Sequence, residues 1–139
     1  MLSNRSIPRC AVIPELAYAD VTRAAAWLCD VFGFTVRLRI ADHRVQLNVN
    51  GCALVVTERG RASGGVEAMQ SVMVRVEDAN AHHARAVQHG VEVLRPPTDY
   101  PYGERQYTVR DIGGHVWTFS QSIADVDPAD WGGRLETQA

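Results

Sequence analysis

All 14 basic residues of this 139-residue sequence are arginine, and none is lysine. Arginine is therefore the basic side chain that is available for chemistry. The absence of lysine excludes Schiff-base chemistry, a phosphate-binding Walker lysine and a lysine general base. Arginine keeps its charge, and its planar guanidinium matches carboxylates and stacks on aromatic rings. If the protein binds a ligand, we therefore expect an acidic or aromatic one.

The cysteines and histidines offer weaker chemistry. Cys10, Cys29 and Cys52 are an odd count at irregular spacing, which indicates neither a disulfide framework nor a zinc site and fits a reduced, cytoplasmic setting. His82 and His83 are adjacent on an expected helix, so they point in different directions and are poorly placed to share an ion. We expect both to face solvent. A nucleophile elbow is also missing from the sequence, which argues against a serine hydrolase.

Composition and charge exclude two broad classes of partner. With 46% hydrophobic and 22% charged residues, the chain predicts one domain with a sizeable core. A net charge of -2 without a basic tail makes a nucleic-acid partner a poor expectation. The sequence has no apolar run near the ~20 residues of a membrane span, and residues 1–9 do not form a signal peptide.

The first half of the chain predicts one strand, one helix and three further strands. Asp20 stands where a helix N-cap belongs, and apolar residues then recur at helical spacing until Gly33. Alternating apolar residues and the hairpin dipeptide Asn50-Gly51 indicate the strands that follow. The expected elements are a strand at 12–18, a helix at 21–32 and strands at 35–40, 44–49 and 52–57.

The second half repeats this order. Asp78 and Gly90 correspond to Asp20 and Gly33 at an offset of about 57 residues, a spacing typical of repeated structural units. The expected elements are a strand at 71–76, a helix between Asp78 and Gly90, and strands at 91–94, 105–110 and 115–120.

Two such units predict an α+β fold of tandem βαβββ modules, whose cupped mixed sheet encloses an inner cavity. Each helix covers one face of its own sheet, and the opposite faces line the cavity.

The domain is expected at 10–121. Its modules lie at about 10–59 and 70–121, joined by a glycine-rich linker at 60–69. An N-terminal extension occupies 1–9 and an irregular tail 122–139.

This layout resembles the vicinal oxygen chelate superfamily, which includes glyoxalases and bleomycin resistance proteins. The resemblance covers residues 10–121, and its most specific part is the last hairpin, Tyr102 to Phe119. There Ile112 and Gly113 replace the proline and second aspartate of the family's usual turn. The resemblance implies the βαβββ fold, a small-molecule ligand and a homodimer.

Enzymes of the superfamily hold a divalent metal with His, Gln and Glu side chains at four strand positions. Counted from the helix caps and the turn glycines, those positions are Ile13, Val55, Ser71 and Thr118 in this sequence. Isoleucine and valine have no donor atom, and neutral serine or threonine alone binds metal weakly. We therefore expect neither a metal nor another cofactor.

Strand alternation predicts which side chains line the cavity. For the last hairpin we prefer an odd loop, because this places Tyr107, Val109, Trp117 and Phe119 on one buried face. The mixed polar and apolar pocket that results is typical of small-molecule sites. Its predicted residues are Ile13, Glu15, Val55, Ser71, Met73, Arg75, Gln106, Thr108 and Thr118.

Some assignments stay open at this point. Glu15 and Arg75 either bind the ligand or pair with each other, since a buried carboxylate needs a partner. The stiff aromatic segment 96–103 either closes over a ligand or simply connects two strands. Trp131 in the tail is either a lid or an interface residue.

Three functions are compatible with the sequence. The first is a metal-free protein of the bleomycin-resistance kind that binds a small acidic or aromatic molecule. The alternative is a metal-dependent lyase, isomerase or dioxygenase with relocated ligands, in which Glu15 acts with His115 or Glu58. The third is an interaction module whose cavity is filled by its own side chains.

Overall fold

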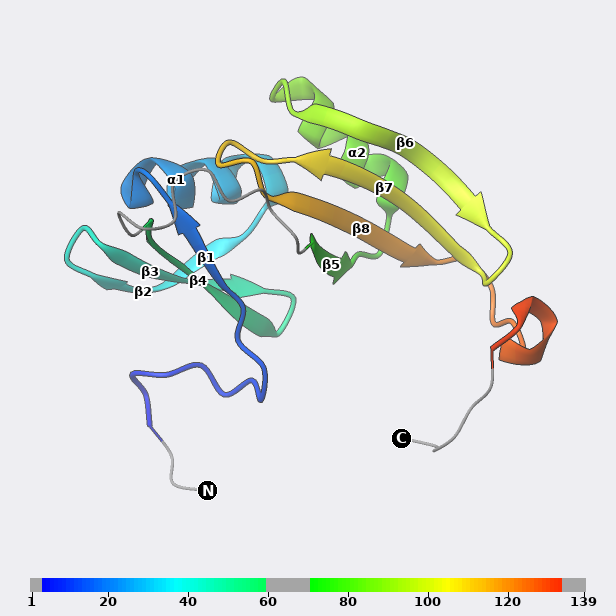
Figure 1. The fold of residues 1–139 in the computed structure, drawn as a ribbon, viewed down its shortest axis with the longest axis horizontal. Coiled ribbons are helices and arrows are strands. Elements are labelled where there is room, and N and C mark those ends of the chain that lie inside the picture. The colour runs from blue at the N-terminus through cyan, green and yellow to red at the C-terminus, as the bar shows by residue number, and fades with distance from the viewer. Residues whose placement is uncertain (1–3, 60–70, 134–139) are drawn as a thin grey trace.

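The computed structural model describes residues 4–59 and 71–133, and it contains the expected βαβββ order twice. The α+β expectation is confirmed (Figure 1). The expected linker at 60–69 lies outside the described residues. The first module consists of β1 (Glu15–Tyr18), α1 (Val21–Phe32), β2 (Thr35–Ile40), β3 (Arg44–Val49) and β4 (Cys52–Glu58). The second consists of β5 (Ser71–Arg75), α2 (Ala79–Gln88), β6 (Glu92–Tyr100), β7 (Glu104–Arg110) and β8 (Val116–Ser122), followed by the short helix η2 (Pro128–Trp131).

Each module forms its own four-stranded sheet, with strand orders β1-β4-β3-β2 and β5-β8-β7-β6. In each sheet the first and last strands of the module run parallel, and the other neighbours run antiparallel. Both helices lie on one side of the molecule, so each sheet keeps a second face away from the helices (Figure 1). We call this second face the inner face.

The helix ends follow the sequence signals. The Asp20 side chain accepts a hydrogen bond from the backbone nitrogen of Arg23, and Asp78 caps α2 through Ala81 in the same way. Gly33 ends α1 with a φ of 80°, a conformation that costs glycine little because it has no Cβ.

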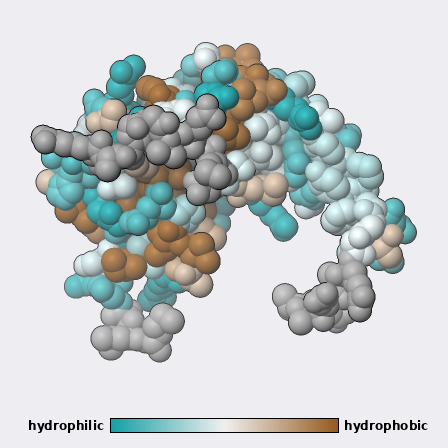
Figure 2. Space-filling model, in the orientation of Figure 1, coloured by the Kyte–Doolittle hydropathy of each residue, from teal (hydrophilic) through white to brown (hydrophobic). Residues whose placement is uncertain are grey.

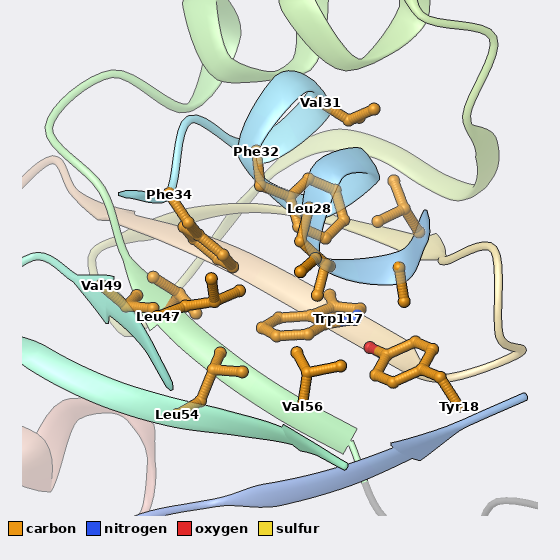
Figure 3. Close-up of a cluster of buried hydrophobic side chains, with 14 of the residues drawn as sticks. Tyr18, Leu28, Val31, Phe32, Phe34, Leu47, Val49, Leu54, Val56 and Trp117 are labelled. Carbon is orange, nitrogen blue, oxygen red and sulfur yellow. The ribbon is translucent and has the colours of Figure 1, made fainter. Parts of the chain in front are cut away.

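A single hydrophobic core joins the two modules. Trp117 of the second module lies among side chains of the first, including Phe34, Leu47 and Val56 (Figure 3). The ring centroid of Phe32 is 5.3 Å from that of Trp117 and 4.8 Å from that of Phe119. Aromatic rings bury the largest apolar areas of any side chains, so this contact contributes strongly to holding the modules together.

The last hairpin has the predicted arrangement. Tyr107 pairs with Phe119 and Val109 with Trp117, and all four side chains are fully buried. Arg110 pairs with Val116, so the five-residue loop 111–115 has the odd length that puts these side chains on one face. The inner face of this hairpin therefore carries Gln106, Thr108 and Thr118.

Two boundaries differ from expectation by three residues or more. The first strand begins at Glu15 rather than residue 12. Strand β6 continues to Tyr100, so residues 96–100 belong to a strand and not to a loop. Pro96 and Pro97 are tolerated because β6 is an edge strand, and its pairing with β7 is interrupted between Arg95 and Thr98.

The exposure predicted for His82 is wrong. Its Nε2 lies 3.2 Å from the carbonyl oxygen of Phe32, its Nδ1 contacts the Tyr107 hydroxyl, and its ring packs at a tilt against Phe119. Helix periodicity could not reveal this, because the contacts come from the other module and from β7.

None of the helices among the described residues is both long enough and apolar enough to cross a bilayer.

Candidate functional site

One row of side chains crosses the inner face of the second module. Met73 on β5 pairs with Thr118 on β8, and Thr118 pairs on its other side with Thr108 on β7. Thr108 pairs in turn with Arg95 on β6. Because Trp117 and Phe119 point into the core, Thr118 between them points away from it. The Thr108 and Thr118 hydroxyls are 3.0 Å apart and hydrogen-bonded.

This row forms the floor of an open hollow of about 410 Å³. Four of the predicted ligand-binding residues, Met73, Gln106, Thr108 and Thr118, lie together in its wall. Figure 2 shows a deep concavity on this side of the molecule, between its main body and the limb that leads to the C-terminal segment. The complete lining is Met73, Leu94, Arg95, Tyr100, Tyr102, Gln106, Thr108 and Thr118.

A chain of hydrogen bonds sets the orientation of the Gln106 amide in the hollow. Gln106 Nε2 donates to Ser120 Oγ at 3.0 Å, and Ser120 Oγ donates to Glu104 Oε1 at 2.7 Å. The Tyr102 hydroxyl donates to Gln106 Oε1 at 3.2 Å. The amide is thus held in one orientation, which leaves a preorganised polar group beside the threonine hydroxyls.

Aromatic rings form one side of the hollow. The rings of Tyr100 and Tyr102 stack with centroids 5.3 Å apart and an interplanar angle of 9°. Trp131 from η2 lies against Tyr102 at a centroid distance of 5.2 Å and is 48% exposed. Arg95 Nη1 donates to the Tyr100 hydroxyl at 2.6 Å, so a guanidinium stands at the end of this aromatic wall.

A β-bulge explains why Arg95 reaches the inner face. Val93 pairs with Val109 and Arg95 pairs with Thr108, so Leu94 is an extra residue on β6. A bulge of this kind brings two consecutive side chains toward one face. Both Leu94 and Arg95 accordingly line the hollow.

The first module has the same bulge. Val36 pairs with Leu47 and Leu38 pairs with Gln46, so Arg37 is the extra residue on β2. The dipeptides Arg37-Leu38 and Leu94-Arg95 therefore occupy equivalent places, and each edge strand contributes one arginine to an inner face.

Three predicted residues belong to the inner face of the first module and not to this hollow. Glu15 is level with Val55, and Ile13 precedes β1. Glu15 forms its ion pair with Arg44 rather than with Arg75, which decides against the pairing considered from the sequence. Val55 is 2% exposed and offers no open surface.

The other two predicted residues, both on β5, are exposed. Ser71 is level with Val116, one row away from Met73. Arg75 lines a second, more apolar hollow of about 260 Å³ next to the hairpin between β3 and β4. Its carbonyl oxygen accepts a hydrogen bond of 2.7 Å from Asn50 Nδ2.

The family follows from comparison with known proteins. The model of the glyoxalase/bleomycin resistance protein/dioxygenase superfamily matches residues 6–119. The chain belongs to this superfamily. A comparison with curated protein sequences finds no match.

Solved structures of the superfamily have the same fold. TioX from Micromonospora sp. ML1 is similar at 33% sequence identity, with a TM-score of 0.70 over 85% of this chain and 100% of TioX. A glyoxalase-related enzyme from Fulvimarina pelagi has 20% identity and a TM-score of 0.65, covering 81% of this chain and 88% of its own. The fosfomycin resistance protein FosX from Listeria monocytogenes has 15% identity and a TM-score of 0.66, covering 87% and 94%. The last two likenesses bear on the fold alone.

The metal that the superfamily's enzymes use does not fit the residues of this chain. Ile13 and Val55 lack donor atoms, and Ser71 and Thr118 supply only neutral hydroxyls. Across residues 4–59 and 71–133, no three His, Cys, Asp or Glu side chains gather where they could hold an ion. Two of the three alternative ligands are engaged elsewhere, since Glu15 pairs with Arg44 and His115 Nε2 contacts the carbonyl oxygen of Ala17 at 2.8 Å.

Sequence reasoning missed Arg95 and left the aromatic wall undecided. It ended the strand at Leu94, and a bulge is invisible to simple alternation. The break in alternation after Val93 is the signal that could have shown it. Tyr100, Tyr102 and Trp131 were recognised as unusual, but their mutual contacts depend on where η2 folds back.

Proposed function

We propose that this protein binds a small molecule with an aromatic ring and an acidic or other oxygen-bearing group, on the inner face of its second module and without a catalytic metal. The observation that carries the proposal is the hollow in which an aromatic wall and the Arg95 guanidinium meet. Its lining combines apolar and aromatic side chains with hydrogen-bonding groups, and small-molecule sites use the two kinds for affinity and for orientation.

The roles divide by chemistry. Tyr102 and Trp131 offer ring faces against which a flat ligand can pack, a contact that adds about 0.5–1.5 kcal/mol beyond simple burial. Arg95 supplies fixed donors to a carboxylate or carbonyl oxygen. Gln106 and the paired threonines supply orientation, while Met73 and Leu94 supply apolar contact. These groups bind and orient a ligand, and none of them is arranged as a nucleophile with its base.

A binding role agrees with the relatives. The superfamily that the chain matches includes bleomycin resistance proteins. Capture of a harmful small molecule requires a shaped pocket but no chemistry.

In addition, we expect a homodimer, because the hollow is open on one side and exposes Met73 and Leu94, which a second copy of the chain could cover.

Titration of the protein with aromatic carboxylates, beginning with 2-naphthoate, tests the proposal through tryptophan fluorescence. We expect saturable quenching that is lost in Trp131→Phe, because Trp117 is fully buried and Trp27 packs against Phe32 away from the hollow. Arg95→Ala should weaken binding about tenfold, since the carboxylate of the ligand loses its charge-assisted hydrogen bond. Arg105→Ala is the matched control, because Arg105 pairs with Asp99 and does not line the hollow.

Two results would overturn the proposal. One is equal affinity of wild type, Arg95→Ala and Tyr102→Ala for every aromatic acid that binds. The other is stoichiometric binding of Ni²⁺, Zn²⁺ or Fe²⁺ by the purified protein in equilibrium dialysis. That result would favour the alternative function, a metal-dependent enzyme.

A further inference from the structure

The N-terminal arm, residues 4–14, lies on the inner face of the first module (Figure 1). Two side chains of the sheet hold it there by its main chain. Arg37 Nη2 donates to the carbonyl oxygens of Arg5 at 3.0 Å and Ile7 at 3.3 Å. Gln46 Nε2 donates to the carbonyl oxygen between them, that of Ser6, at 2.8 Å. Three consecutive carbonyl groups are therefore bound by side chains.

The donors are preorganised for this contact. Arg37 Nη1 donates to Gln46 Oε1, so the guanidinium and the amide hold each other in position. Gln46 is 2% exposed, and it points away from the core because its neighbours Val45 and Leu47 point into it. A buried amide must have its hydrogen bonds satisfied, and here the arm satisfies them.

Burial on the inner face extends beyond these bonds. Ala53 and Val55 are buried although neither belongs to the hydrophobic core, and Pro8 is the buried residue of the arm. The face thus combines carbonyl-binding donors with a small apolar surface. Residues 4–7 form a turn, in which the backbone nitrogen of Ile7 donates to the carbonyl oxygen of Asn4 at 3.4 Å. The face therefore fits a peptide turn that is followed by a proline-sized group.

Nothing in the contact depends on the side chains of residues 5–7, which are exposed. Arg37 and Gln46 bind main-chain oxygens that every peptide has. The arm also forms no strand with the sheet in the described residues, so it is attached by individually modest hydrogen bonds. Such a segment can leave and return without disturbing the fold.

The corresponding inner face of the second module is open. Leu94-Arg95 occupies the place equivalent to Arg37-Leu38, and there the bulge arginine lines an open hollow. The two inner faces are thus duplicates, one covered by the chain's own segment and one open.

We propose that the inner face of the first module is a binding site for a turn of peptide chain, which the N-terminal arm occupies in cis and which a peptide of the same sequence can occupy when the arm is absent. The site recognises consecutive main-chain carbonyl groups through Arg37 and Gln46. It is independent of the ligand site on the second module, so either proposal can fail without the other.

Limited trypsin digestion of the full-length protein tests the docking. Cleavage after Arg5 and Arg9 requires the arm to leave the sheet, and its rate follows the population of released arm. Arg37→Ala should raise this rate about tenfold or more, because two hydrogen bonds are lost. Arg37→Lys should also raise it, since lysine cannot hold two carbonyls and Gln46 with a planar fork. Arg39→Ala, an exposed change two residues along β2, is the control.

Thermal unfolding of each variant separates release of the arm from loss of the fold. Faster cleavage in both Arg37 variants at an unchanged melting temperature supports the proposal. Equal cleavage rates in the Arg37 variants and in Arg39→Ala would overturn it.

Binding in trans tests the site itself. A chain that begins at residue 10 is titrated with a fluorescein-labelled peptide of residues 3–9, and anisotropy is measured. We expect saturation by about 1 mM peptide, the effective concentration that a short tether supplies. The same truncated chain with Arg37→Ala should not bind. Absence of binding by the folded truncated chain, or binding that survives Arg37→Ala, would contradict the proposal.

Discussion

At the scale of single residues, one carboxylate connects the two modules. Asp111 accepts hydrogen bonds from the Tyr18 hydroxyl at 2.5 Å and from Trp117 Nε1 at 2.9 Å. It also accepts from the backbone nitrogens of Gly113 and His115. Burial, reinforced by the Asp111 charge, raises the pKa of Tyr18 far above its ordinary value, so the hydroxyl remains a donor. From the sequence, Asp111 was only a turn residue, because its partner Tyr18 is 93 residues away.

His82 should make stability depend on pH. Burial lowers the pKa of its imidazole below the ordinary 6.5, with Arg85 acting in the same direction and the Phe32 carbonyl opposing it. Below about pH 6.5 the unfolded chain then binds more protons than the folded chain, so stability falls as the pH falls toward the folded pKa. Urea unfolding between pH 7.5 and 5 should show this loss.

The variant His82→Gln should lose part of that pH dependence, whereas His43→Gln, a change in an exposed turn, should keep all of it. Besides Arg85, Tyr107 lies next to the ring, and His83 packs against Tyr107, so His83→Gln is included to separate its contribution. A wild-type protein whose unfolding free energy changes no more steeply with pH than that of His82→Gln would contradict the assignment.

At the scale of elements, hydrophobic patterning and caps were sufficient for most of the fold. The odd loop of the last hairpin was predictable because only one register buries Tyr107, Val109, Trp117 and Phe119 together. The end of β6 was not, because prolines argue for a loop unless the strand is known to be an edge. The docked arm was not predictable either, since its bonds involve main-chain carbonyls that carry no sequence signal.

The turn between β7 and β8 should tolerate no side chain at Gly113. A Cβ there would lie 2.4 Å from Cδ1 of Tyr18, inside the contact that holds Tyr18 to Asp111. We expect Gly113→Ala to lower the free energy of unfolding by about 1–3 kcal/mol, as overpacking of a buried contact does. Gly51→Ala is the control, because its turn is open and only its φ of 83° opposes a side chain, at about 1 kcal/mol. A smaller loss for Gly113→Ala than for Gly51→Ala in urea unfolding would show that Tyr18 moves freely.

At the scale of the whole molecule, the duplicated modules divide their faces between stability and binding. The helix-side faces merge into one core, while one inner face lies under the arm and the other is open. This arrangement explains why the predicted pocket was split. Strand alternation predicted the inward positions of each sheet separately, and it contained no information on whether the two inner faces meet. Glu15 and Val55 therefore lie on one inner face, and Gln106, Thr108 and Thr118 on the other.

A shared core predicts that the modules unfold together. Phe32 belongs to the first module, yet its ring touches Phe34 of that module and Trp117 and Phe119 of the other. Phe32→Ala should cost about 3–5 kcal/mol, because it removes a buried ring and leaves a cavity between the modules. Unfolding should remain one transition, with tryptophan fluorescence and far-ultraviolet circular dichroism giving the same urea midpoint. Val87→Ala, a change on the exposed face of α2, controls for the loss of apolar atoms alone. Two separate transitions in wild type would show that each module is stable by itself. A decrease in the free energy of unfolding for Phe32→Ala no larger than that for Val87→Ala would show that the contact between the modules contributes little.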